Sequence, residues 1–268
     1  MTQGNYANVD GLKMYYEIHG AGKPLVLLHG GLGSIAMFAQ LLPALAESRQ
    51  VIAVDLQGHG HTADMDRPFS YERMADNIAA LIQQLKLPNA DLVGYSLGGG
   101  VALHTAIRHP EVVRKLVLVS TPFKSEGWFP ESRAGMKALN AQAAQAMVGS
   151  PPHQAYVNSA PQPENWTTLV TKTGQLVGQD YDWSAGVSRL ALPTMIVVGD
   201  ADAVRPTHAV QFFELVGGGQ RDAGWDGSGM PNSRLAVLPA TTHYNIIDSP
   251  LLAPIITAFL DAPMPQDK

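Results

Sequence analysis

Leu92-Val93-Gly94-Tyr95-Ser96-Leu97-Gly98-Gly99-Gly100 is the stretch of sequence that decides the fold. The apolar pair before Gly94 is typical of a buried strand, and residues 97–109 have the spacing of a helix. A serine at a tight strand-to-helix turn, with small neighbours that relieve crowding, is presented to a substrate as a nucleophile. We therefore predict Ser96 as the catalytic nucleophile; the alternative is a glycine-rich structural turn.

Short apolar runs alternate with helical patterns along most of the chain. Runs that are apolar on both faces predict a mostly parallel sheet covered by helices on both sides, an α/β fold. An alternating run over residues 12–18 predicts an early antiparallel strand. The functional site of such a sheet lies at the carboxyl ends of its strands. The remaining runs are residues 25–28, 51–54, 92–93, 116–119, 195–198 and 235–238, and the other helical patterns are 37–46, 71–87, 208–216 and 251–260.

A serine nucleophile needs a base and an acid, which follow it in the chain order Ser, acid, His. Asp200 and Asp202 come directly after an apolar strand, so both lie at the expected edge of the sheet. We choose Asp202 as the acid and expect Asp200 to cap the turn. Asp226 and Asp248 are weaker candidates, because neither closes a strand.

Only two histidines follow Asp202 in the sequence. His208 falls within a predicted helix, whereas His243 comes just after the strand that ends at Leu238. We predict that His243 accepts the Ser96 proton, while Asp202 orients the imidazole and stabilises its protonated form.

The oxyanion hole requires two backbone N–H donors aimed at the developing negative charge. Leu97, the residue after the nucleophile, supplies one. The second is expected from Gly31 in the loop His29-Gly30-Gly31-Leu32-Gly33, whose glycines let the main chain approach the substrate. A phosphate-binding loop is a poor alternative, since no Gly-Lys-Ser/Thr follows.

Residues 123–187 contain no strand-like run, and residues 136–147 are alanine-rich and predicted helical. We interpret this segment as a small helical lid, inserted after the sixth strand and over the carboxyl edge of the sheet. The core is then 1–122 and 188–268. An ordinary helical excursion with buried aromatic residues is the alternative.

The substrate pocket is predicted to be apolar, because aromatic and methionine residues gather in the lid and no cluster of Arg or Lys accompanies them. A glycine-rich loop before His243 adds one more aromatic residue, whose alternative role is packing under that loop. The candidate substrate-binding residues are Trp128, Phe129, Met147, Trp166 and Trp225.

Composition excludes several other classes. The net charge is −5 with no basic stripe, so no nucleic-acid partner is expected. The chain has no cysteine, which removes disulfides and thiolate metal sites, and no metal or other cofactor is expected. No signal peptide is visible at the N-terminus, and no apolar stretch is long enough to span a membrane, so a cytoplasmic protein is expected. The oligomeric state stays open.

The sequence resembles the α/β-hydrolase superfamily over nearly its whole length, and within it the small esterase, lactonase and cofactor-free haloperoxidase-like group. The matching pieces are His29-Gly30-Gly31, Asp55-Leu56-Gln57-Gly58-His59-Gly60, the Ser96 turn, Gly199 to Asp202, and His243. Relatives commonly carry Arg where this chain has Gln57, which puts a local ion pair in doubt and not the chemistry.

Relatives that open epoxides or displace halide carry Asp where this chain has Ser96, so the resemblance implies an acyl-enzyme route. The implied substrate is a small-molecule carboxylic ester or lactone, acylated homoserine lactones included. Perhydrolysis and C–C bond hydrolysis would use the same triad and remain alternatives. A ligand receptor that retains the triad is a third possibility, from a different class.

Overall fold

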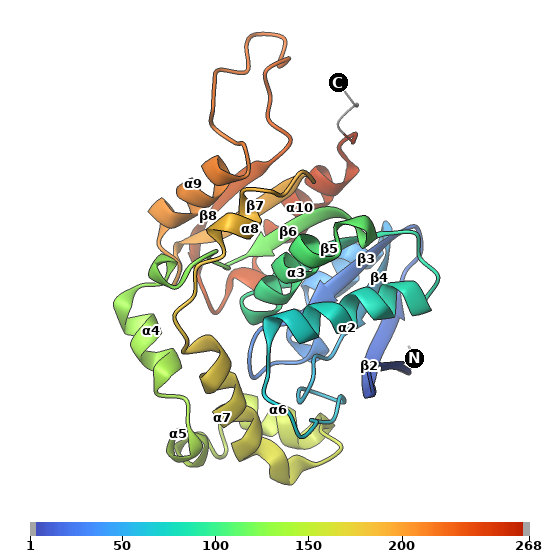
Figure 1. The fold of residues 1–268 in the computed structure, drawn as a ribbon, viewed down its shortest axis with the longest axis vertical. Helices are drawn as coiled ribbons and strands as arrows, with labels where there is room; N and C mark the ends of the chain where they lie inside the picture. Colours follow the sequence, from blue (N-terminus) through green and yellow to red (C-terminus); the bar gives the residue numbers. More distant parts are fainter. Residues whose placement is uncertain (1–3, 265–268) are drawn as a thin grey trace.

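Every apolar run picked out from the sequence lies in a strand of one eight-stranded sheet, in the order β1-β2-β4-β3-β5-β6-β7-β8 (Figure 1). The computed structural model describes residues 4–264; residues 1–3 and 265–268 of the predicted core lie outside the described residues. β1 and β2 pair antiparallel, β2 pairs antiparallel with β4, and the other pairings are parallel, as predicted. The strands are β1 (Asn5–Val9), β2 (Leu12–His19), β3 (Lys23–Leu28), β4 (Arg49–Val54), β5 (Ala90–Tyr95), β6 (Val113–Val119), β7 (Thr194–Ala201) and β8 (Arg234–Thr242).

Both faces of the sheet are covered, because alternate residues of each central strand enter two different apolar clusters. Val26 and Leu28 of β3 pack with α2 (Tyr71–Gln84), α3 (Leu97–Arg108) and α9 (Pro206–Leu215). Leu25 and Leu27 pack on the other face with α1 (Leu41–Ala46) and α10 (Leu252–Asp261). This explains why the strand sequences are continuously apolar.

Strand β1 was not anticipated, because its five residues give too short an alternating pattern. Asp10 and Gly11 connect it to β2 with positive φ angles of 48° and 76°. A two-residue turn of this kind matches the twist of an antiparallel hairpin.

Two predicted helices are each divided in the structure. Residues 37–46 fall in a short 3-10 helix, η1 (Ile35–Phe38), and in α1. Residues 136–147 fall in α4 (Pro130–Lys137) and α5 (Ala141–Ala146). The second break has a clear cause: the Asn140 side chain accepts hydrogen bonds from the N–H groups of Gln142 and Ala143 and so starts a new helix.

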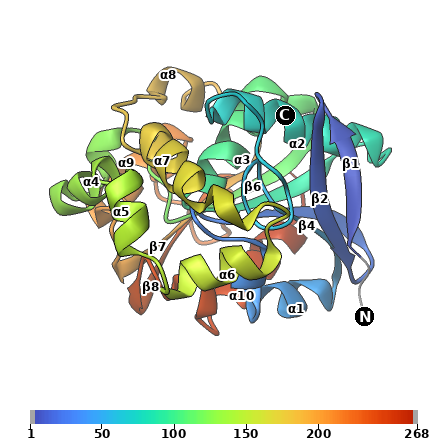
Figure 2. The ribbon, with the colours of Figure 1, turned by 90° about the horizontal axis from the view of Figure 1, so that it is seen from below.

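Five α-helices occupy the chain between β6 and β7. Besides α4 and α5 they are α6 (Pro151–Ser159), α7 (Trp166–Val177) and α8 (Ser184–Val187). Figure 1 shows α4 to α7 at one end of the molecule, and Figure 2 looks onto α5, α6 and α7 from that end. Two isolated β-bridges involve the start of this helical segment. Trp128 pairs with Val204 of the core, and Lys124 pairs with Asp182 near the end of the segment. Its division from the core, and its action as a lid, stay predictions.

Candidate active site

Ser96 lies between β5 and α3 with φ 54° and ψ −117°, a conformation that L-residues rarely adopt. The neighbouring glycines make this turn possible. A Cβ at Gly94 would lie 2.4 Å from the Gly98 carbonyl oxygen, and one at Gly98 would lie 2.4 Å from the His29 carbonyl oxygen. Because backbone cannot yield as a side chain can, the turn requires both glycines.

Ser96, His243 and Asp202 form one hydrogen-bonded chain. The Ser96 Oγ lies 3.0 Å from His243 Nε2, and His243 Nδ1 lies 3.0 Å from Asp202 Oδ1. The Tyr95 hydroxyl donates to the His243 carbonyl oxygen over 2.6 Å, which ties the histidine loop to the serine turn. Three segments distant in sequence therefore meet at the carboxyl edge of the sheet.

Asp202 is buried, and both of its oxygens are occupied. Oδ1 accepts from His243 and the Val204 N–H, whereas Oδ2 accepts from the Gly199 N–H and the Ser120 hydroxyl. Burial opposes ionisation, but the hydrogen bond and positive charge of His243, with the other donors, outweigh it and lower the pKa of the carboxyl. The carboxylate is thus kept charged and fixed against the imidazole.

Asp200 has the other role expected of the pair. Its carboxylate accepts hydrogen bonds from the N–H groups of Ala240 and Thr241 at 3.0 and 3.2 Å. Ala240 has a positive φ of 55°, so this contact holds a tight bend just before His243. Asp200 shapes the histidine loop without touching the imidazole.

The two residues predicted to supply the oxyanion donors lie close together beside Ser96. Gly31 and Leu97 line the same cavity as the serine, and a Cβ at Gly31 would lie 3.5 Å from Leu97 Cδ1. Leu97 is the first residue of α3, where helix N–H groups have no partner within the helix. Leu32 has a positive φ of 58°, which marks a tight turn in the loop that carries Gly31.

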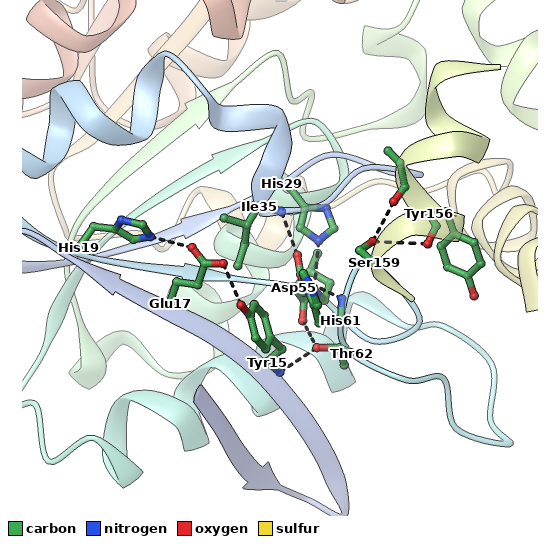
Figure 3. Close-up of polar contacts among 12 residues, drawn as sticks. Tyr15, Glu17, His19, His29, Ile35, Asp55, His61, Thr62, Tyr156 and Ser159 are labelled. Carbon is green, nitrogen blue, oxygen red and sulfur yellow. Dashed lines mark hydrogen bonds and ion pairs between the residues drawn. The ribbon is translucent and has the colours of Figure 1, made fainter. Parts of the chain in front are cut away.

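Asp55 anchors this loop from below, as Figure 3 shows. Its Oδ1 accepts from the Ile35 N–H at 2.8 Å, and its Oδ2 accepts from the N–H and ring of His61. Burial opposes the charge of Asp55, but these donors prevail and lower its pKa. His29 adds a second tie, since its Nε2 accepts from the Leu56 N–H at 3.1 Å.

Gln57, the residue that departs from the family pattern, bridges two charged side chains. Its amide donates to Asp64 Oδ1 and accepts from Arg67 Nε, each at 3.0 Å. The other oxygen of Asp64 pairs with Lys172 of α7 at 2.6 Å. Gln57 thus holds one oxygen of Asp64 while the other oxygen forms an ion pair with the helical segment.

Two hollows meet at Ser96. A small cavity of about 140 Å³ lies beside Ser96, Gly31 and Leu97, and no charged residue lines it. A larger cleft of about 490 Å³ also reaches Ser96 and Gly31, and it alone of the two is lined by His243. α6 contributes Pro151, Pro152 and Ala155 to this large cleft.

Of the predicted substrate-binding residues, only Trp128 lines the small cavity, and its ring lies 5.4 Å from that of His243. Phe129 and Met147 are partly buried and line neither hollow. Trp166 is buried inside the helical segment, where its Nε1 donates to the Ala144 carbonyl oxygen. None of these three residues lines either hollow at Ser96.

Trp225 is fully exposed, in a loop that projects from the opposite end of the molecule to α4–α7 (Figure 1). The expectation that it reaches the pocket rim must be corrected. The loop leads into the amino end of β8, whereas His243 follows its carboxyl end. Trp225 and the active site therefore lie at opposite edges of the sheet.

No site role was assigned from the sequence to Ser120, or to the cavity-lining residues Tyr71, Thr173, Tyr181 and Trp183. Ser120 follows a strand and has a positive φ of 53°, so a polar residue at a strand end was the available sign. Tyr71 begins α2, within the core, where no pattern links it to the helical segment.

Residues 4–264, which the structure describes, contain no group of three or more His, Asp or Glu side chains placed to hold a metal ion. The same residues contain no helix long and apolar enough to cross a membrane.

Comparison with known proteins agrees with this geometry. Residues 23–205, more than half of the chain, match the family model described as the alpha/beta hydrolase fold. The chain belongs to the α/β-hydrolase family.

Several of its relatives are named as hydrolases of different kinds. It is 30% identical to a pimeloyl-[acyl-carrier protein] methyl ester esterase of Chromobacterium violaceum over 87% of this chain and 91% of that protein. It is 40% identical to the 2-hydroxymuconate semialdehyde hydrolase of Pseudomonas sp. strain CF600, over 41% of each protein. The crystal structure of E-2-(acetamidomethylene)succinate hydrolase superposes with a TM-score of 0.76 at 22% identity, covering 98% of this chain and 100% of that one. The last likeness concerns the fold alone.

Proposed function

We propose that the protein is a serine hydrolase that cleaves carboxylic esters or lactones through an acyl-enzyme intermediate. The observation that carries the proposal is the 3.0 Å contact between Ser96 Oγ and His243 Nε2, on a positive-φ turn that faces an uncharged cavity. The match to an esterase over 87% of the chain supports the same class.

The reaction proceeds in two halves. Ser96 Oγ attacks the carbonyl carbon as its proton passes to His243 Nε2, and the carbonyl oxygen gains negative charge beside the N–H groups of Gly31 and Leu97. Collapse of this intermediate breaks the bond to the leaving alcohol, which takes the proton from His243. Water, activated by the same imidazole, then attacks the acyl-enzyme and releases the acid and Ser96.

The two hollows give the substrate a direction. The leaving group must receive its proton from His243, so we assign it to the large cleft, which His243 lines. The acyl group then occupies the small cavity beside Gly31 and Leu97. A lactone would extend into both hollows, since its acyl and alcohol parts are joined. The helical segment would act as the lid that closes the small cavity.

Hydrolysis of a C–C bond is the second candidate, favoured by the 40% identity to 2-hydroxymuconate semialdehyde hydrolase. The substrate in that name carries a carboxylate and no ester. The small cavity offers no Lys or Arg to balance such a charge, which favours the ester reading. Turnover of a vinylogous diketone, compared with an ester, separates the two; turnover with acetate and hydrogen peroxide tests perhydrolysis.

The proposal is tested with p-nitrophenyl butanoate and two serine variants. Ser96→Ala removes the nucleophile, so hydrolysis should fall to the uncatalysed rate. The control is Ser233→Ala, which removes a buried serine hydroxyl elsewhere in the fold that donates to the Val216 carbonyl oxygen. A fluorophosphonate should add its mass to the peptide that contains Ser96. Unchanged turnover in Ser96→Ala would refute the proposal. If the wild-type protein hydrolysed no member of a broad panel of esters, the receptor alternative would be favoured.

The small-molecule substrate is the only partner this function requires. A cytoplasmic location is part of the same proposal and rests on the lack of cysteine. Fractionation of the producing cells tests it.

A further inference from the structure

The small cavity contains hydroxyl groups that nothing in the fold uses. Tyr71, from α2, is buried and lines the cavity, and no hydrogen bond among the described residues involves its hydroxyl. Thr173, from α7, is also buried there, and its Oγ1 has no partner. Buried polar groups are normally satisfied, so the Thr173 hydroxyl calls for a partner, and the Tyr71 hydroxyl is free to meet one in the cavity.

Tyr181 supplies a third hydroxyl, already oriented by a neighbour. Its oxygen accepts a hydrogen bond from Trp128 Nε1 at 3.0 Å, which leaves its own proton available to donate. Both rings are fixed by packing: Tyr181 stacks on Trp183 with 4.1 Å between centroids, and Tyr71 meets the same indole edge-on at 5.0 Å. Burial raises the pKa of both tyrosines, so they remain neutral donors.

We propose that the small cavity selects a short acyl chain that bears an uncharged oxygen, held by the hydroxyls of Tyr71 and Tyr181. This inference rests on the proposed ester hydrolysis and specifies its substrate class. The cavity is small, with a volume of about 140 Å³, so it suits a short acyl chain. A plain alkyl chain fills the space but leaves the donors unpaired. A carboxylate would meet no cation.

Three ethyl esters test the selection: ethyl pentanoate, ethyl 4-oxopentanoate and monoethyl succinate. They share the leaving group, and the distal group changes from methylene to ketone to carboxylate. Acid release is followed in a pH-stat, with Ser96→Ala as the blank. We expect kcat/KM for the ketone to exceed that for the alkyl ester about 3- to 10-fold, the range of a net hydrogen bond. The carboxylate should fall at least about 30-fold below the ketone.

Tyr71→Phe and Tyr181→Phe identify the donors. Each should reduce the ratio of kcat/KM for ethyl 4-oxopentanoate to that for ethyl pentanoate toward unity. Tyr156→Phe is the matched control, because Tyr156 lies in the helical segment outside the cavity and donates to the Gln162 carbonyl oxygen. It should retain the wild-type preference.

Each other outcome has a definite meaning. Equal wild-type rates for ketone and alkyl esters overturn the selection while leaving ester hydrolysis intact. If kcat/KM in the tyrosine variants falls equally for all three esters and the preference for the ketone is kept, the tyrosines have a structural role. That result also overturns the inference. No Ser96-dependent hydrolysis of any ester overturns the proposed function itself.

Discussion

The Ser120 hydroxyl donates a hydrogen bond to Asp202 Oδ2, on the side of the carboxylate that does not touch His243. Ser120 therefore helps to hold the acid in the plane where it meets the imidazole. Removing one such donor leaves the buried carboxylate less well fixed.

Ser120→Ala should lower kcat about 3- to 10-fold, the range of a net hydrogen bond of about 0.5–1.5 kcal/mol, with KM little changed. Steady-state kinetics on a simple ester measures it. Ser233→Ala is the matched control: that serine is also buried, but its hydroxyl bonds the Val216 carbonyl, in another part of the fold. Equal losses in both variants would show that Ser120 has no special link to the acid.

Asp202→Asn should cost about 10⁴-fold in kcat, because an amide holds the imidazole in the wrong tautomer. Asp200→Asn is an unusually close control, since it lies two residues away and caps a turn through Ala240 and Thr241. It should retain activity to within about 10-fold, as an amide oxygen still accepts from the backbone. A larger loss of kcat in Asp200→Asn than in Asp202→Asn would mean that Asp200 is the acid of the triad.

The Asp64–Lys172 ion pair should set the position of α7. Lys172 Nζ also donates to the carbonyl oxygens of Met65 and Arg67, so one partly buried ammonium joins the helix to the core loop. Lys172→Met should raise KM about 3- to 10-fold and destabilise the fold by about 1–3 kcal/mol, since neighbouring Thr173 lines the cavity.

Lys137→Met controls for this change, because Lys137 pairs with Asp180 at 3.3 Å inside the helical segment and is half-exposed. Combining Lys172→Met with Asp64→Asn should cost less than the sum of the two single changes. Strict additivity of the two would mean that the pair does not act as a unit.

His59 should make stability depend on pH. It is fully buried, and burial, with the charge of His29, lowers its pKa to about 3. The unfolded chain binds a proton at this residue below about pH 6.5 while the folded protein does not, so stability falls as the pH drops through that window. Between pH 7 and pH 5, His59 should lower the free energy of unfolding by about 2 kcal/mol.

Urea unfolding at the two pH values measures this loss. His59→Asn keeps a donor near the Gln57 carbonyl that the ring contacts at 2.9 Å, and it should lose about 2 kcal/mol less than the wild type. His153→Asn, at a partly exposed position of α6, should behave as the wild type does. An unchanged pH dependence in His59→Asn would mean that other groups carry the acid sensitivity.

Much of the fold was predictable because local patterns determine it. Apolar runs covered on both faces are the signature of central parallel strands, and each one was found. The positions of Ser96, Asp202 and His243 followed from their places at strand ends. The break at Asn140 was missed because a cap interrupts a helix without changing its alanine-rich composition.

The pocket was less predictable because it is made by contacts between distant segments. Trp128, Trp166 and Trp225 have the same residue type, yet one lines the cavity, one packs the helical segment and one is exposed. Only the direction of β8 reveals that the Trp225 loop leaves from the wrong end of the sheet. Tyr71 belongs to the core and reaches the pocket only through the placement of α2.

The distribution of tryptophan offers an optical readout of the site. Three of the four indoles lie between residues 123 and 187, close to Ser96 or packed behind it, and the fourth is the solvent-exposed Trp225. A Trp225→Phe variant would therefore emit only from the helical segment. Its intrinsic fluorescence would follow substrate entry in real time, without a dye or a label.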